Sequence, residues 1–88
     1  MIRRRVVVHG RVQGVFFRDT VRRMAQSRGI AGSVRNTPDG TVEAVFEGND
    51  EDVESMVRWC RQGPRGAQVE RVEVIEEDPE GLDEFRVR

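Results

Sequence analysis

The sequence predicts an α+β fold, a two-layer α/β sandwich with two helices on one face of a mostly antiparallel sheet. Two amphipathic helical segments are separated by strand-like segments, and the order along the chain is strand, helix, strand, strand, helix, strand. A short fifth strand follows at the C-terminal end. This βαββαβ order is that of ferredoxin-like folds, and we expect residues 1–88 to form a single domain.

The first strand and the first helix are predicted from their apolar residues. Residues 3–9 read as a strand because β-branched valines lie at their centre. One apolar stripe of the helix that follows comprises Phe17, Val21, Met24 and Ala25. Gly29 suits a left-handed C-cap, and Arg28 lies near the negative end of the helix dipole.

A hairpin follows the first helix. Residues 30–36 and 41–47 are predicted strands, and residues 36–40, Asn-Thr-Pro-Asp-Gly, form the turn because of the proline and the Asp-Gly pair. Two further short strands are expected at 67–75 and 84–87.

The second helix has the clearest local pattern. Asn49 or Asp50 can cap it, and Gly63-Pro64 end it. Its expected buried stripe comprises Val53, Met56, Val57 and Cys60. Trp59 lies to one side of that stripe, so we expect it to be partly buried beside the sheet.

The composition excludes several classes of protein. No apolar run approaches about 18 residues and no export signal opens the chain, so we expect no membrane partner and a cytoplasmic location. Cys60 is the only cysteine, which leaves no intramolecular disulfide and no Cys/His cluster for a metal. We therefore expect no metal and no other cofactor, with Cys60 serving as a small buried hydrophobic residue.

The charge is distributed unevenly. Residues 1–40 hold nine arginines and two acidic residues, whereas residues 41–88 hold six arginines and fourteen acidic residues; lysine is absent. Codon bias or adaptation to heat would explain many surface arginines. The other explanation is that the basic half carries an anion site, because the guanidinium fork suits phosphate and carboxylate.

Several functions are compatible with this topology, so the site residues must discriminate between them. An RNA-recognition module needs aromatic residues on the third strand, where only Phe46 is present, between Glu43 and Glu47. A soft-metal carrier would need paired cysteines in the first loop. We therefore expect no nucleic-acid partner; a non-catalytic regulatory or anion-binding domain and an anion-binding enzyme remain.

Residues 10–18, Gly-Arg-Val-Gln-Gly-Val-Phe-Phe-Arg, indicate an anion site where the first helix begins. No Ser, Thr, Asp or Asn stands at the cap position, so the first N–H groups of the helix lack an obvious partner. Gly14 can adopt dihedrals that let successive N–H groups converge, and Arg18 adds a guanidinium beside them. The apolar residues expected to anchor this loop in the core are Val15, Phe16 and Phe17.

These residues resemble the acylphosphatase family. Residues 10–18 and 32–43, Gly-Ser-Val-Arg-Asn-Thr-Pro-Asp-Gly-Thr-Val-Glu, match its two motifs at the expected spacing, and Gly63-Pro64 and Phe85 also agree. The similarity spans essentially the whole chain. It implies an α/β sandwich that hydrolyses the carboxyl-phosphate bond of small acyl phosphates and releases inorganic phosphate, without a metal or cofactor. We also expect a monomer.

The resemblance also implies a role for particular residues. Arg18 matches the phosphate-binding arginine, Asn36 matches the asparagine that orients the attacking water, and Thr37 matches a supporting residue. The main-chain amides of the phosphate cradle correspond to those of Gln13, Gly14, Val15, Phe16, Phe17 and Arg18. Two residues depart from the family pattern. Ser33 stands where many members have a bulky aromatic residue, and Phe16 is larger than the residue that many members have at its position. These departures bear on substrate preference and stability and not on activity.

The chemistry is consistent with this inventory of side chains. Arg18 stays protonated and Asn36 has no usable proton equilibrium, so neither is a general base. A carboxylate leaving group, with a pKa of about 4, departs without a proton donor. His9, at the end of the first strand, is a less favoured candidate for a general base. Three arginines are expected to be surface charges: Arg11, Arg22 and Arg35.

Overall fold

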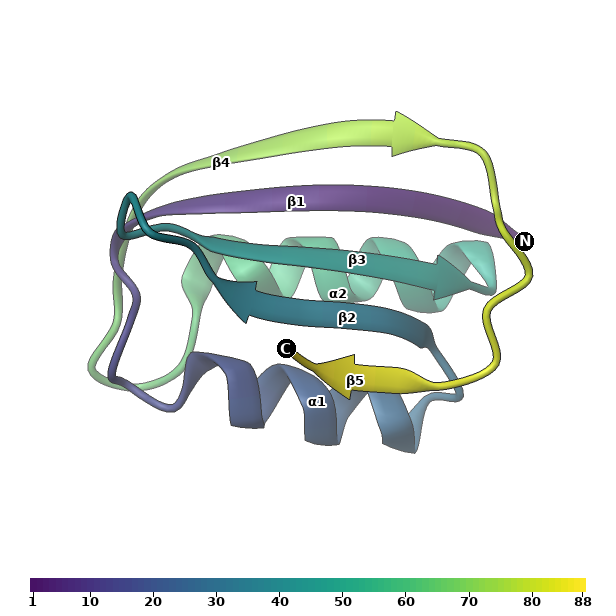
Figure 1. Cartoon of the computed structure of the whole chain (residues 1–88), viewed down its shortest axis with the longest axis horizontal. Coiled ribbons are helices and arrows are strands. Elements are labelled where there is room, and N and C mark those ends of the chain that lie inside the picture. Colours follow the sequence, from purple (N-terminus) through teal and green to yellow (C-terminus); the bar gives the residue numbers. More distant parts are fainter.

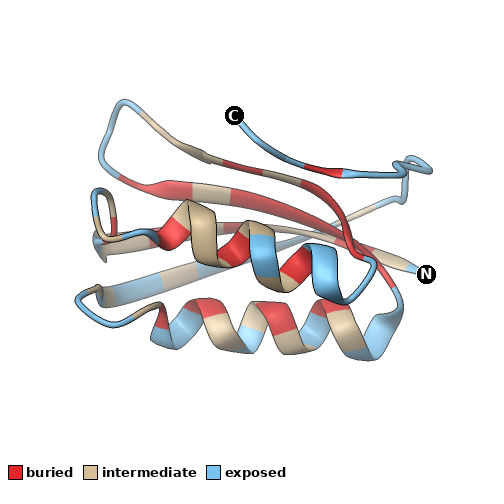
Figure 2. Cartoon of the chain, turned by 90° about the horizontal axis from the view of Figure 1, so that it is seen from below, coloured by how far each residue is buried: buried red, intermediate tan, exposed pale blue.

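The computed structural model describes residues 1–88 as a single five-stranded sheet with two helices. The elements are β1 (Ile2–Arg11), α1 (Phe17–Ser27), β2 (Ala31–Asn36), β3 (Val42–Gly48), α2 (Asp50–Gln62), β4 (Gln68–Glu77) and β5 (Phe85–Val87). The strand order across the sheet is β4-β1-β3-β2-β5, and only the pair of β2 and β5 is parallel. Figure 1 shows α2 behind the sheet and α1 along its lower edge, and Figure 2 shows both helices on the same side of the strands, so the predicted two-layer α+β sandwich is confirmed.

The core lies between the helices and the sheet. Buried residues recur along both helices and run through the central strands, as Figure 2 shows. The largest fully buried apolar side chains are Phe17, Phe46 and Met56. Trp59 is half-buried at the margin and meets the Phe17 ring edge-to-face, with centroids 5.4 Å apart, as its position beside the apolar stripe predicts.

The first strand is longer than the sequence predicts. It continues through Gly10 to Arg11, because the pairing with β4 shifts register between His9 and Gly10 instead of ending there. At Gly10, which has φ of +130°, a Cβ would lie 2.1 Å from the Gln68 carbonyl oxygen. The glycine therefore permits a bulge with close backbone contact, and the strand extends toward the loop before α1.

The two helices begin in different ways. Asn49 caps α2, with its side-chain oxygen accepting from the N–H of Glu51 at 2.9 Å and of Asp52 at 3.4 Å, which decides between the two predicted caps. The residue before α1 is Phe16, in the left-handed region at φ 60° and ψ 25°, and no side chain caps that helix. The main chain at the start of α1 is thus left with its donors free.

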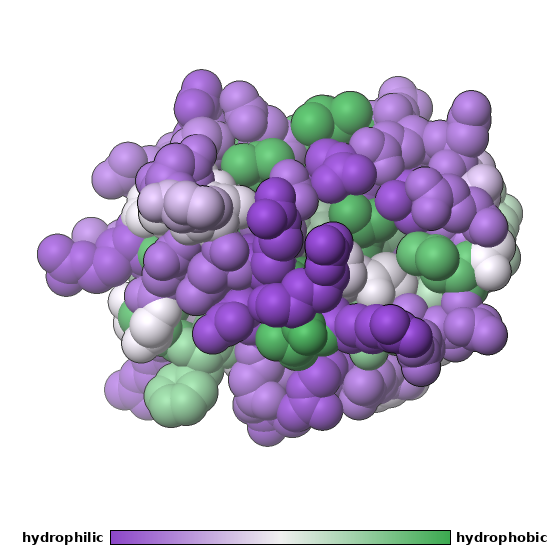
Figure 3. Space-filling model, in the orientation of Figure 1, coloured by the Kyte–Doolittle hydropathy of each residue, from purple (hydrophilic) through white to green (hydrophobic).

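Ion pairs between strands bring arginines from the first half of the sequence together with glutamates from the second half. Glu77 of β4 binds Arg5 of β1 at 2.7 Å, Arg5 reaches Glu43 of β3 at 3.2 Å, and Glu43 binds Arg35 of β2 at 3.0 Å. This series crosses four strands on the face opposite the helices, which is mostly hydrophilic in Figure 3. Basic residues of the first half and acidic residues of the second half therefore meet across the sheet.

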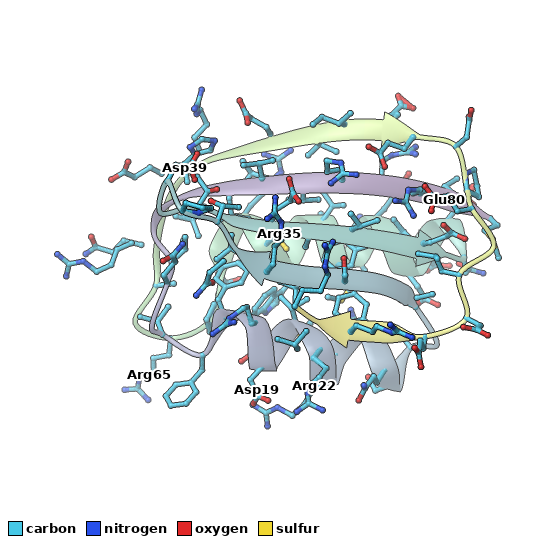
Figure 4. All side chains as sticks on the ribbon, viewed as in Figure 1. Asp19, Arg22, Arg35, Asp39, Arg65 and Glu80 are labelled. Atoms are coloured by element: carbon cyan, nitrogen blue, oxygen red, sulfur yellow. The ribbon has the colours of Figure 1, made fainter.

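A buried carboxylate fixes the connection between β4 and β5. Glu47 of β3 accepts from the N–H groups of Glu80, Gly81 and Leu82 at 2.9, 2.7 and 3.0 Å, and from the Arg3 guanidinium at 3.1 Å. Glu80 lies at the end of the sheet opposite the Asp39 turn (Figure 4). Because this segment carries the chain from one edge of the sheet to the other, Glu47 helps to set the position of β5. No helix has the length and apolar character needed to cross a membrane.

Candidate functional site

A cavity of about 450 Å³ lies where α1 begins, β2 ends and β5 passes. Its lining residues are Val12, Gly14, Phe16, Phe17, Arg18, Asp19, Arg22, Asn36 and Val87. The fold thus brings most of the predicted site residues to one place. Gln13, Val15 and Thr37 do not line the cavity.

The main chain before and at the start of α1 carries a run of free donors. The first amide to bond within this region is that of Thr20, which donates to the Phe16 carbonyl at 3.1 Å, and the Thr20 hydroxyl donates to the same oxygen at 2.8 Å. No N–H group from Gln13 to Asp19 donates to another protein atom. Positive φ angles at Gly14 (74°) and Phe16 (60°) bend the main chain in this segment. Free N–H groups at a helix N-terminus favour an anion.

Arg18 adds a positive charge that no Asp or Glu side chain neutralises. Its guanidinium is half-exposed, and its one hydrogen bond is a long contact of 3.5 Å from Nη1 to the main-chain oxygen of Arg88. The next two arginines of α1 differ, because Arg22 and Arg23 pair with Asp19 at 2.7 and 3.2 Å. Arg18 therefore keeps its donors available at the cavity.

The pair of Asp19 and Arg22 forms another part of the cavity wall. Both side chains lie together on the outer side of α1 (Figure 4). The hydrogen bond from Arg22 lowers the pKa of Asp19, and Arg23 adds to the effect, so the carboxylate stays ionised. Arg22, expected to be a surface charge, thus lines the cavity. Its spacing of four residues from Arg18, which places the two on one helix face, is the signal that could have revealed this.

Asn36 reaches the cavity from the end of β2. It pairs with Val42 of β3, and its side chain makes no hydrogen bond to another protein atom. The next residue, Thr37, turns into the hairpin instead, where its hydroxyl bonds the Asp39 carboxylate and lies 2.6 Å from the Thr41 hydroxyl. The bonds from these two hydroxyls lower the pKa of Asp39. Thr37 therefore holds the turn next to Asn36.

Gln13 connects the loop before α1 to that same turn. Its side-chain amide donates to the main-chain oxygens of Thr37 at 2.8 Å and of Thr41 at 2.9 Å. The resemblance implies only a main-chain role for Gln13, and no local pattern in the sequence reveals this side-chain contact. The Gln13 side chain consequently joins the loop before α1 to the turn that follows Asn36.

The structure corrects the prediction that three apolar residues anchor the loop. Phe17 is buried and Val15 packs against the core, but Phe16 is 80% exposed. Phe16 lies between two inward-facing residues and has a left-handed backbone, which turns its side chain outward at the cavity rim. Ser33, the other noted departure, lies beside Val45 in the sheet and does not line the cavity.

The remaining titratable candidates lie away from the cavity. His9 bonds Glu73 at 3.2 Å and contacts Arg71 on the neighbouring strand. Cys60 is fully buried, and this burial raises the pKa of its thiol to about 12. No group of three or more His, Cys, Asp or Glu side chains is arranged to hold a metal ion.

The fold and this cavity define an α+β sandwich protein in which free main-chain N–H groups and the Arg18 guanidinium favour an anion. Comparison with known proteins agrees: the family model described as Acylphosphatase matches residues 4–87. A relative named acylphosphatase from Haloarcula marismortui is 58% identical over 86 residues, covering 98% of this chain and 94% of the relative. A second, from Thermococcus kodakarensis, is 54% identical over 86 residues, again covering 98% of this chain and 94% of the relative.

The structural comparison points the same way. The crystal structure of acylphosphatase from Bacillus subtilis superimposes with a TM-score of 0.95 at 37% identity, covering 100% of this chain and 99% of that one. The chain belongs to the acylphosphatase family and is an enzyme of that family.

Proposed function

We propose that the enzyme hydrolyses the carboxyl-phosphate bond of small acyl phosphates, with Arg18 and the loop amides binding the phosphate and Asn36 positioning the attacking water. One observation carries the proposal. Arg18, Asn36 and three loop residues with unpaired N–H groups line one cavity, the three being Gly14, Phe16 and Phe17.

Phosphate binding follows from the charges and donors at the start of α1. The positive end of the helix dipole and the free amides of residues 13–18 favour a dianion. Arg18 supplies a planar fork that can donate two parallel hydrogen bonds to phosphate oxygens. A bound phosphate would replace the weak 3.5 Å contact with the Arg88 oxygen, so binding sacrifices little within the protein.

Hydrolysis itself then depends on position and charge. Phosphoryl transfer passes through a loose transition state, so orientation of the water and stabilisation of the equatorial oxygens supply most of the catalysis. The Asn36 side chain holds the water in line with the leaving carboxylate, and the water passes its proton to a phosphate oxygen. The carboxylate, with a pKa of about 4, departs as an anion. No step requires a metal, and every group comes from one chain, so we propose a monomeric enzyme.

The direct test measures phosphate release from acetyl phosphate in the presence of EDTA, with ethyl phosphate as the alkyl control. We expect hydrolysis of the first substrate alone, because an alkoxide leaving group needs a proton that no residue at the cavity supplies. Loss of acetyl phosphate hydrolysis in EDTA would contradict the metal-free mechanism.

Two variants separate binding from turnover. Arg18→Ala should weaken the binding of inorganic phosphate, measured as competitive inhibition, by about 2–5 kcal/mol. Arg65→Ala, at an exposed arginine outside the cavity, should leave phosphate binding unchanged. Asn36→Ala should abolish most turnover while keeping phosphate affinity. Unchanged phosphate affinity in Arg18→Ala would show that the assignment of the phosphate site is wrong.

A further inference from the structure

Phe16 has a conformation and an exposure that the fold does not require. It is the only non-glycine residue with a positive φ, and its ring is the most exposed of the large hydrophobic side chains. The left-handed backbone would be less strained with glycine or asparagine, and a ring that is 80% exposed adds little to the core. Strain of this kind, at a site, points to function.

The backbone that carries this ring is held by its surroundings. The Phe16 carbonyl accepts two hydrogen bonds from Thr20, at 3.1 and 2.8 Å. On either side, Phe17 is buried and Val15 packs against the core. The backbone is therefore held from three directions, which keeps the ring at the rim of the cavity.

A second apolar side chain is exposed in the same cavity. Val87 of β5 is 42% exposed, although the strand pairs with β2 and the preceding Phe85 is buried. A phosphate group needs no apolar wall. The Asp19–Arg22 pair, at 2.7 Å, offers a matched ion pair and no free cation for a second carboxylate.

We propose that Phe16 and Val87 form a subsite for the acyl portion of the substrate, so that the enzyme favours acyl phosphates with an aromatic or other apolar acyl group over those with a small or charged one. This inference rests on the proposed function, because the acyl group can reach the rim only when its phosphate lies against Arg18 and the loop amides.

The test compares kcat/KM for benzoyl phosphate and acetyl phosphate in the wild type and in Phe16→Asn. Asparagine tolerates the left-handed backbone and removes the ring. We expect the ratio of kcat/KM for benzoyl phosphate to kcat/KM for acetyl phosphate to fall about tenfold in Phe16→Asn, which is the effect of losing a modest apolar contact. Using the change in the ratio removes the different intrinsic reactivities of the two substrates.

Three further variants complete the design. Val87→Ser should lower the ratio in the same direction, and it carries the test if Phe16→Asn does not fold. Phe16→Leu, which keeps an apolar side chain, should retain most of the ratio. Val74→Asn is the matched control, because Val74 is 38% exposed on β4 and does not line the cavity.

The outcomes distinguish this inference from the proposed function. A ratio within twofold of the wild type in both Phe16→Asn and Val87→Ser would overturn the acyl subsite. A wild-type enzyme whose activity is not inhibited competitively by inorganic phosphate would instead overturn the phosphate site at Arg18, whatever the ratio shows.

Discussion

The side-chain amide of Gln13 donates to the main-chain oxygen of Thr37 at 2.8 Å, and so joins the loop before α1 to the turn that follows Asn36. A second bond from the same nitrogen, to Thr41 at 2.9 Å, strengthens the connection. The two bonds span 24 and 28 residues of sequence, and they link the donors proposed to bind phosphate to the residue proposed to hold the water.

We therefore predict that Gln13→Ala lowers kcat by about 10- to 100-fold, because a small displacement of Asn36 from the in-line position is costly. Competition by inorganic phosphate should change little, since the loop amides and Arg18 remain. Gln26→Ala, at an exposed glutamine on α1, is the control. Parallel losses of kcat and phosphate affinity would indicate general damage to the loop and contradict a positioning role.

Phe16 and Phe17 are predicted to respond in opposite ways to truncation. Phe16→Gly should leave the free energy of unfolding unchanged or raise it by up to about 1 kcal/mol, because glycine relieves the left-handed strain and the ring is largely exposed. Phe17→Ala, in the core, should lower it by about 3–5 kcal/mol. Urea denaturation measures both values. A loss above about 2 kcal/mol in Phe16→Gly would show that its ring supports the fold.

Glu47→Gln is predicted to lower the free energy of unfolding by about 2–4 kcal/mol at pH 7, because one amide oxygen cannot accept all the hydrogen bonds that Glu47 receives. Arg3 keeps its ion pair with Glu77 at 2.8 Å, so the guanidinium is not left unpaired. Glu73→Gln, at an exposed position, is the control and should change it by less than about 1 kcal/mol.

The pH dependence of the same variant gives a second measurement. Burial alone would raise the pKa of Glu47, but the hydrogen bonds from the N–H groups of residues 80–82 and from Arg3 outweigh it and hold this pKa below its ordinary value of 4.5. The stabilisation is therefore fully present above about pH 4.5 and is lost as the pH falls through the lowered pKa of the folded state. The difference in unfolding free energy between wild type and Glu47→Gln should be constant near neutrality and narrow in acid. A constant difference down to pH 2 would contradict this account.

Cys60 is predicted to be unreactive in the folded enzyme. Its thiol is fully buried on α2, and burial raises its pKa to about 12, so thiolate is scarce at pH 8. Ellman's reagent should label it only as fast as the protein unfolds, and immediately in concentrated urea. Rapid labelling of the native enzyme would show that α2 opens locally.

The sequence by itself determined the elements whose origin is local. The apolar stripe of α2 and the cap before it depend on neighbours three or four residues away, and so does the free N-terminus of α1 after Gly14. The unpaired main-chain donors beside Arg18 could be predicted for the same reason. The sequence predicts that the first strand ends at His9, whereas β1 continues to Arg11. The difference arises because the bulge at Gly10 depends on the partner strand β4 and not on the segment itself.

Only the tertiary structure decided which distant residues meet. That Asn36 and Val87 reach the cavity at Arg18 follows from strand order and register, with β2 lying between β3 and β5. The bonds of Gln13 to the hairpin turn and of Glu47 to residues 80–82 have no signature in periodicity, because hydrogen bonds between remote segments depend on the assembled backbone. The same is true of the charges, since the excess of arginine in the first half is largely matched by carboxylates that the sheet places opposite it.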